Sequence, residues 1–246
     1  MEEHVRALVD AEWEERLGVD RSILRSGGVH VVRADRGSND AMSFLLGETC
    51  IVVVAEDEDE VEPARRALAG LGPRTAFTAE ALRAVVGPDA LVDGPSWHSY
   101  AGGRSFRGGA DPAALPVDGT CPALLTFLQG VDVADRAEGG FPCDPGSADP
   151  ATTRFWLLRD TGRVVAAGNM TGWRDLPADV GVLTSPGERG RGLAGRLVGA
   201  MVHAALPTVG VARYRALASN VASLAVARRL GFEPYGQSYR ARKPTP

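Results

Sequence analysis

The first half of the chain mixes helical and strand-like spacing of its apolar residues. Three segments repeat apolar positions every three or four residues and predict amphipathic helices: residues 2–17, 61–69 and 78–86. Three others are rich in β-branched or aromatic residues and predict strands: residues 29–32, 43–54 and 91–100. Together they predict a mixed α/β fold for this half.

The second half predicts a helix, a hairpin, a further strand and another helix. The helix is expected at residues 122–131. The hairpin consists of residues 154–158 and 163–171, joined by the turn sequence Asp160-Thr161-Gly162. A third strand follows at residues 178–184, and a helical apolar pattern begins at Leu193.

A stretch rich in glycine, proline and arginine, residues 101–116, predicts a linker or surface loop between the two halves. We therefore expect an N-terminal α/β domain at residues 1–115 and a second domain at residues 116–246. A chain of 246 residues is long enough for two such domains.

The composition is that of a globular protein, with 44% hydrophobic and 24% charged residues. Because no run of eighteen apolar residues occurs and the N-terminus is acidic, we expect neither a membrane segment nor a signal peptide. Cys50, Cys121 and Cys143 are odd in number and match neither a zinc pattern nor a disulfide framework. These features favour a cytoplasmic protein without a metal site.

The charge is distributed unevenly along the chain. Residues 189–246 contain ten basic residues and a single acid, Glu233, so they carry +9 while the first 188 residues carry −13. Such a basic segment favours a polyanionic ligand, either nucleic acid or a phosphorylated cofactor. The segment lacks interleaved aromatic residues and any recognised nucleic-acid motif, so we expect no nucleic-acid partner.

The loop between the third strand and the following helix carries the strongest chemical signal. Gly190 and Gly192 lack the Cβ atoms that would keep a phosphate at a distance, and the helix opening at Leu193 directs free N–H groups and its positive dipole end to the same place. Arg189 and Arg191 add positive charge. The pattern predicts a pyrophosphate ligand.

The same glycines also fit the dinucleotide fingerprint, because Gly195 completes the spacing Gly190-x-Gly192-x-x-Gly195. That alternative requires a βαβ unit with an acid about twenty residues further on. The only acid after Glu188 is Glu233, and the remaining chain is too short to complete a six-stranded sheet. A Rossmann domain is therefore disfavoured.

Two motifs resemble the GNAT superfamily of acyl-CoA-dependent N-acyltransferases. The family's loop pattern Arg/Gln-x-x-Gly-x-Gly/Ala corresponds here to Arg189, Gly192 and Ala194. Downstream, a strand at residues 215–218 precedes Asn220-x-x-Ser223, and the helix that this opens ends before Gly231-Phe232. The resemblance covers residues 117–246 and implies a GNAT-like mixed α/β fold. The first half is then expected to be a second, degenerate GNAT-like domain that covers the acceptor site or mediates a homodimer.

The resemblance implies an N-acetyltransferase that transfers an acetyl group from acetyl-CoA to a primary amine of a small molecule or peptide. It also implies that the strand before the loop splays from its neighbour and that the pantetheine arm runs along its exposed backbone. The residues expected to hold CoA are Val182, Leu183, Thr184, Arg189, Gly190, Arg191, Gly192, Leu193, Ala194, Gly195, Asn220 and Ser223.

Two catalytic residues are implied by the same resemblance. Asp179 lies near the position where the family often has its general base, with a turn or strand-capping role as the alternative. Ala227 stands where many members have a tyrosine that protonates the leaving thiolate. Tyr235 is the expected replacement, with Tyr239, Ser223 and water as alternatives. This departure also leaves open a non-catalytic CoA sensor or interaction module.

Overall fold

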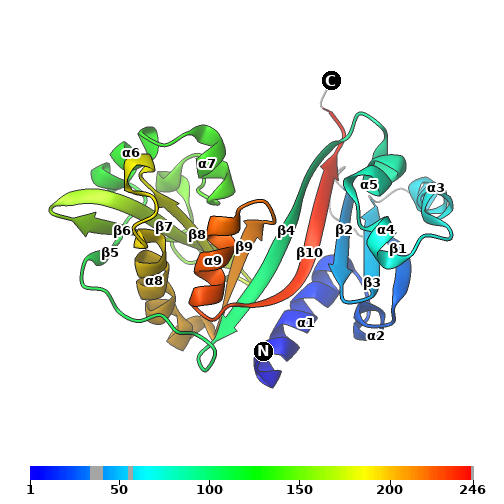
Figure 1. Cartoon of the computed structure of the whole chain (residues 1–246), viewed down its shortest axis with the longest axis horizontal. Coiled ribbons are helices and arrows are strands. Elements are labelled where there is room, and N and C mark those ends of the chain that lie inside the picture. The colour runs from blue at the N-terminus through cyan, green and yellow to red at the C-terminus, as the bar shows by residue number, and fades with distance from the viewer. Residues whose placement is uncertain (34–40, 55–57, 245–246) are drawn as a thin grey trace. The chain divides into compact units, whose positions relative to one another are not determined.

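The computed structural model describes residues 1–33, 41–54 and 58–244, and the side chains of residues 58–60 lie outside this description. The chain divides into two compact units (Figure 1). Unit 1 comprises Met1–Val5, Ser99–Ala216 and Asn220–Glu233, and unit 2 comprises Arg6–His98, Leu217–Ser219 and Pro234–Pro246. These contacts divide the chain differently from the predicted domains 1–115 and 116–246, because the first five residues pack in unit 1 and the C-terminal strand packs largely in unit 2.

The strands of unit 2 are neighbours in the order β1-β3-β2-β10-β4. These strands are β1 (Gly28–Arg33), β2 (Ala41–Leu46), β3 (Thr49–Val54), β10 (Glu233–Arg242) and the first part of β4 (Leu91–Gly102). The helices of this unit are α1 (Glu3–Leu17), α2 (Arg21–Leu24), α3 (Glu58–Leu68), α4 (Pro73–Ala76) and α5 (Ala79–Val86). Strand β1 runs parallel to β3, whereas β2 runs antiparallel to β3 and to β10.

The core of unit 2 explains why its central strands are so apolar. Every residue of β3 is buried, and residues of α3, α4 and α5 pack against β2 and β3. Trp13 of α1 stacks on Phe44 of β2 with ring centroids 3.9 Å apart. A strand covered on both faces must be apolar throughout rather than alternating. The helices predicted for the first half and the strands predicted at residues 29–32 and 91–100 are present in the described residues, whereas residues 43–54 belong to two antiparallel strands, β2 and β3, joined by a turn at residues 47–48.

Unit 1 contains the elements predicted for the second half. Its strands are β5 (Ala114–Val117), β6 (Arg154–Asp160), β7 (Arg163–Trp173), β8 (Leu176–Thr184) and β9 (Val211–Leu217), in the sheet order β9-β8-β7-β6-β5. Its helices are α6 (Pro122–Gln129), α7 (Val133–Glu138), α8 (Leu193–Val209) and α9 (Val221–Arg229). The hairpin of β6 and β7 turns at Thr161 and Gly162, both with positive φ, which matches the right-handed twist of the flanking strands.

The two faces of this sheet carry separate cores. Buried residues of α8, among them Leu197, Val198 and Met201, pack on one face of β6, β7 and β8. Residues of α6, among them Leu124 and Phe127, pack on the other face. Figure 1 shows α8, in gold, beside β6 to β8. Among the described helices, none has the length and apolar character needed to cross a bilayer.

The edge of β8 opens within the sheet of unit 1. The parallel pairing of β8 with β9 covers Asp179↔Arg213 and Val180↔Tyr214. On its other edge, β8 stays paired with β7 as far as Thr184↔Ala166. The two parallel strands therefore separate after Val180, which leaves N–H and C=O groups of the last residues of β8 open on the β9 side.

The three cysteines differ in their accessibility. Cys50 is buried in β3, and burial raises the pKa of its thiol to about 12, whereas Cys121 is half-buried and Cys143 is exposed. Because the thiolate is the reactive form, we expect a thiol reagent to label Cys143 first and Cys50 only after unfolding. Mass spectrometry of labelled peptides measures this order, and rapid labelling of Cys50 in the folded protein would contradict it.

Candidate functional site

A cavity of about 390 Å³ lies in unit 1 where β8 and β9 separate. Its walls come from the end of β8, the loop into α8, the start of α9 and parts of α7 and β9. Ten of the predicted CoA-binding residues line it: Val182, Leu183, Thr184, Arg189, Gly190, Gly192, Leu193, Ala194, Asn220 and Ser223. Arg191 and Gly195 belong to the same loop and helix but do not line the cavity. The fold thus brings two distant motifs to one place.

The N-terminus of α8 presents open amide groups at the cavity wall. No side chain caps this helix, and its first backbone hydrogen bond runs from the Arg196 N–H to the Gly192 carbonyl at 3.1 Å. The amides of the three preceding residues therefore lack a helical acceptor, and the helix dipole places partial positive charge beside them. This arrangement favours an anionic ligand.

The glycines of the loop serve the backbone conformation. Gly190 has φ +81° and Gly192 has φ +75°, so both lie in the left-handed region that favours glycine. A Cβ atom at either position would meet no atom within 4 Å. The space that a ligand would need beside these glycines is therefore present. However, the positive φ angles are by themselves a sufficient reason for glycine at both positions.

The loop arginines are paired with acidic side chains of unit 1. Arg189 Nη2 lies 2.6 Å from Asp135 Oδ2, and Arg191 contacts both Glu188 and Asp160, the latter at 2.8 Å. These contacts offset much of the positive charge that the loop sequence suggested. Arg215 and Arg229 also line the cavity, and their spacing in the sequence did not mark them as site residues.

The start of α9 holds a chain of polar contacts. Asn220 caps the helix, because its Oδ1 accepts the Ser223 N–H at 2.9 Å, while its Nδ2 donates to Glu138 Oε1 at 2.7 Å. The hydroxyl groups of Ser223 and Tyr214 lie 2.9 Å apart. Burial raises the pKa of the Tyr214 phenol, although the hydrogen bond with Ser223 opposes this. The Tyr214 hydroxyl therefore stays protonated at neutral pH.

Tyr214 lines the cavity and is a functional candidate that sequence reasoning missed. It lies on β9 next to Arg215 rather than on the helix where the family motif places a tyrosine. The alternation of side chains along β9 was the one signal in the sequence that could have identified Tyr214. It places the Tyr214 side chain on the same face of the sheet as Val180, its partner on β8.

Asp179 lies inside β8, so it occupies neither a turn nor a strand end. Its Oδ2 lies 3.5 Å from Nη1 of Arg213, the residue opposite on β9, and the Arg213 side chain is 4% exposed. Its Oδ1 is buried with no hydrogen-bond partner among the described residues. Asp179 lines a second, smaller cavity of about 20 Å³ that shares Val180, Gly181 and three further residues with the main one.

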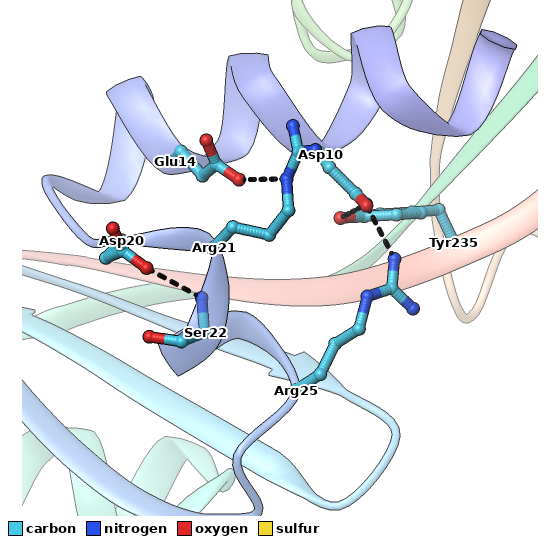
Figure 2. A network of polar contacts seen from close by, with 7 residues as sticks. All are labelled: Asp10, Glu14, Asp20, Arg21, Ser22, Arg25 and Tyr235. Atoms are coloured by element: carbon cyan, nitrogen blue, oxygen red, sulfur yellow. Dashed lines mark hydrogen bonds and ion pairs between the residues drawn. The ribbon is translucent and has the colours of Figure 1, made fainter.

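Tyr235 lies in unit 2, on β10, whereas both cavities consist of unit 1 residues. Figure 2 shows its hydroxyl directed at Asp10, to which it donates at 2.7 Å. Asp10 also accepts from Arg25 Nη2 at 2.7 and 2.9 Å. The Tyr235 hydroxyl thus takes part in a structural network around a buried carboxylate, and its catalytic role stays a prediction.

Residues 132–232 match the model of the acetyltransferase (GNAT) family. This segment contains α7, the hairpin, β8, the glycine loop, α8, β9 and α9, and so all the walls of the cavity. It is therefore a GNAT-family acetyltransferase domain, as the two motifs predicted. A domain of this family implies an acyl-CoA-dependent acyltransferase.

No curated protein matches the chain in sequence. Among the described residues, no group of His, Cys, Asp or Glu is arranged to hold a metal ion.

Three solved structures are similar to this chain. A GCN5-related N-acetyltransferase from Kribbella flavida is similar over 96% of both chains, with 18% identity and a TM-score of 0.50. An acetyltransferase of the GNAT family from Novosphingobium aromaticivorans is similar over 65% of this chain and 70% of its own, with 23% identity and a TM-score of 0.49. A tandem GNAT protein of the clavulanic acid biosynthesis pathway is similar over 68% of this chain and 59% of its own, with 17% identity and a TM-score of 0.44. The Kribbella likeness spans both halves and confirms the predicted GNAT-like α/β fold class.

Proposed function

We propose that this protein is an N-acetyltransferase that transfers an acetyl group from acetyl-CoA to a primary amine of a small molecule or peptide. The observation that carries the proposal is the cavity at the separated edge of β8, which gathers ten predicted CoA residues in a GNAT-family domain.

The residues of the cavity fit acetyl-CoA. The open amides at the start of α8, with Gly190 and Gly192, would hold the diphosphate. The unpaired edge of β8 beyond Val180 would hydrogen-bond the amides of the pantetheine arm, because both are extended chains of donors and acceptors. Asn220 and Ser223 lie at the same wall and would contact the arm from α9.

The catalytic groups lie on the strands that flank the opening. Bound acetyl-CoA supplies a thioester whose acetyl group passes to the amine nitrogen, and an ammonium substrate releases free CoA thiol and one proton overall. Asp179 would accept the amine proton, with the Arg213 guanidinium balancing its charge. Tyr214, through Ser223, would deliver a proton to the thiolate in the role first assigned to Tyr235.

A second candidate function is a CoA-binding sensor without turnover. Ala227 is buried on α9, where the family usually has its tyrosine, and the Tyr235 hydroxyl is bonded to Asp10. Both observations favour a weak general acid. Loss of that acid need not abolish transfer, because the pKa of a thiol is about 8.5 and its thiolate leaves readily.

Calorimetry with CoA and a thiol-release assay with acetyl-CoA separate the two functions. The assay uses Cys143→Ser, because the exposed Cys143 would react with the thiol reagent. We expect CoA binding and amine-dependent thiol release with at least one of a panel of polyamines, aminoglycosides and peptides. Binding without release across the panel would favour the sensor, and absence of binding would reject both.

A further inference from the structure

Two residues that line the smaller cavity in unit 1, Asn169 and Asp179, each have a buried side-chain oxygen without a hydrogen-bond donor among the described residues. The cavity lies between β7, β8 and the residues after α7, and its volume of about 20 Å³ suits one group the size of a water molecule. Asn169 Oδ1 and Asp179 Oδ1 have no partner among the described residues, and Asn169 is 1% exposed. Buried acceptors in folded proteins are nearly always paired, so this pair of atoms indicates a missing donor.

The orientation of the Asn169 amide is fixed by its surroundings. Its Nδ2 donates to the Gly139 carbonyl at 3.2 Å. A flipped amide would set Oδ1 against that carbonyl, placing two acceptors together. Gly181, the residue opposite on β8, leaves the space that the amide fills, because a Cβ there would meet Asn169 Oδ1 at 2.6 Å and Nδ2 at 2.8 Å. The amide of Asn169, which lines the cavity, is thereby held with Oδ1 as its acceptor.

The sheet register brings the second acceptor to the same face. Asn169 pairs with Gly181 and Thr171 pairs with Asp179, so Asn169 and Asp179 are diagonal neighbours about 7–8 Å apart at the backbone. The remaining charged groups around the cavity nearly cancel. Arg213 lies beside Asp179, Glu138 accepts from Asn220, and Arg215 also lines the wall. The cavity therefore presents two acceptors with little net charge.

We propose that this cavity receives the amino group of the acceptor, with Asn169 Oδ1 and Asp179 Oδ1 each accepting one N–H. The inference rests on the proposed acetyltransferase function and names the group that selects its substrate. A neutral primary amine has two N–H donors and a lone pair, so both oxygens are satisfied while the lone pair stays free for transfer. The shared wall of Gly139, Val180 and Gly181 places the nitrogen beside the main cavity.

This arrangement makes Asn169 a specificity-determining residue for primary amines. A secondary amine has one N–H and an alcohol one O–H, so either ligand leaves one buried acceptor unpaired. A site built to hydrogen-bond a group discriminates strongly against analogues that lack it. An ordered water that merely fills the cavity would give no such discrimination.

The test compares n-butylamine with N-methylbutylamine as acceptors, using acetyl-CoA and the Cys143→Ser chain. We expect kcat/KM to favour butylamine at least about tenfold, and Asn169→Leu, which keeps the branched shape and the number of side-chain heavy atoms but removes the acceptor, to reduce this preference to within about twofold. Met170→Leu is the matched control, because Met170 is the next residue on β7, equally buried, and packs on the opposite face. An unchanged preference in Asn169→Leu would overturn the proposal.

If Asn169→Leu does not fold, nuclear magnetic resonance on the CoA-bound wild-type chain tests whether the small cavity binds an amino group. We expect the Asn169 side-chain amide signals to shift on titration with butylamine and not with butyltrimethylammonium, which has no N–H donor. Equal shifts, or none, contradict the proposal. CoA binding is measured separately as the control for the proposed function. If the protein does not bind CoA, the proposed function is wrong. If it binds CoA but the Asn169 signals do not shift with butylamine, only the inference about the small cavity is wrong.

Discussion

Replacing Gly192 by glutamate is expected to lower the affinity for CoA at least about 100-fold, which corresponds to about 2.8 kcal/mol. Gly192 immediately precedes α8 and lines the main cavity. A Cβ atom there meets no atom within 4 Å, so the longer side chain clashes with no neighbour, although φ +75° strains any residue that has a Cβ. The glutamate carboxylate would then compete with the diphosphate for the open amides and repel it.

Two control variants separate this charge effect from backbone strain and from general electrostatics. Gly192→Ala carries the strain of φ +75° without the carboxylate, and we expect at most about a tenfold loss of affinity. Gly187→Glu adds the same charge in the neighbouring turn, outside the cavity lining and without a positive φ. Titration calorimetry with CoA measures all three. Equal affinities for Gly192→Glu and the wild type would place the diphosphate elsewhere.

Most of the main cavity could be predicted from the sequence because its motifs are local. The residues from Val182 to Ala194 form one continuous strand, loop and helix start, so their spacing alone determines their geometry. The second motif needs only the N-cap at Asn220, whose side chain bonds three residues ahead. Local hydrogen bonding and helix periodicity therefore specify most of the cavity wall.

The remainder of the site depends on contacts between distant residues. The ion pair of Arg189 with Asp135 joins positions 54 residues apart, and no periodicity indicates it. The small cavity requires the register of β7 on β8, which opposes Asn169 to Gly181. Tyr235, the expected replacement for the missing helix tyrosine, also has a distant partner, because its hydroxyl bonds to Asp10, 225 residues away.

Elements that the sequence did not reveal lack an apolar pattern. Helix α7 has no buried residue, so no stripe of apolar side chains marks it. Strand β10 places Gly236 and Ser238 at buried positions, which hides its alternation. Strand β5 has only four residues. Tertiary pairing decides the structure of such segments, since their own side chains carry little hydrophobic signal.

Replacing Asp179 by asparagine is expected to lower kcat/KM for the amine by about 10²–10⁴-fold, with CoA affinity unchanged. The loss follows because an amide cannot accept the amine proton that the carboxylate of Asp179 would take. Steady-state kinetics with the amine and titration calorimetry with CoA measure both effects.

The controls for Asp179 address its pairing with the buried Arg213. Removing the carboxylate leaves that guanidinium with less opposing charge, so part of any rate loss could come from a less stable fold. Thermal unfolding measures this part, and Asp179→Glu restores the carboxylate and should recover a share of the rate. Asp160→Asn removes a carboxylate from the surface pair with Arg191 and should leave kcat/KM unchanged. If Asp179→Asn keeps the wild-type kcat/KM, the base lies elsewhere, and Asp179 is a positioning residue for Arg213.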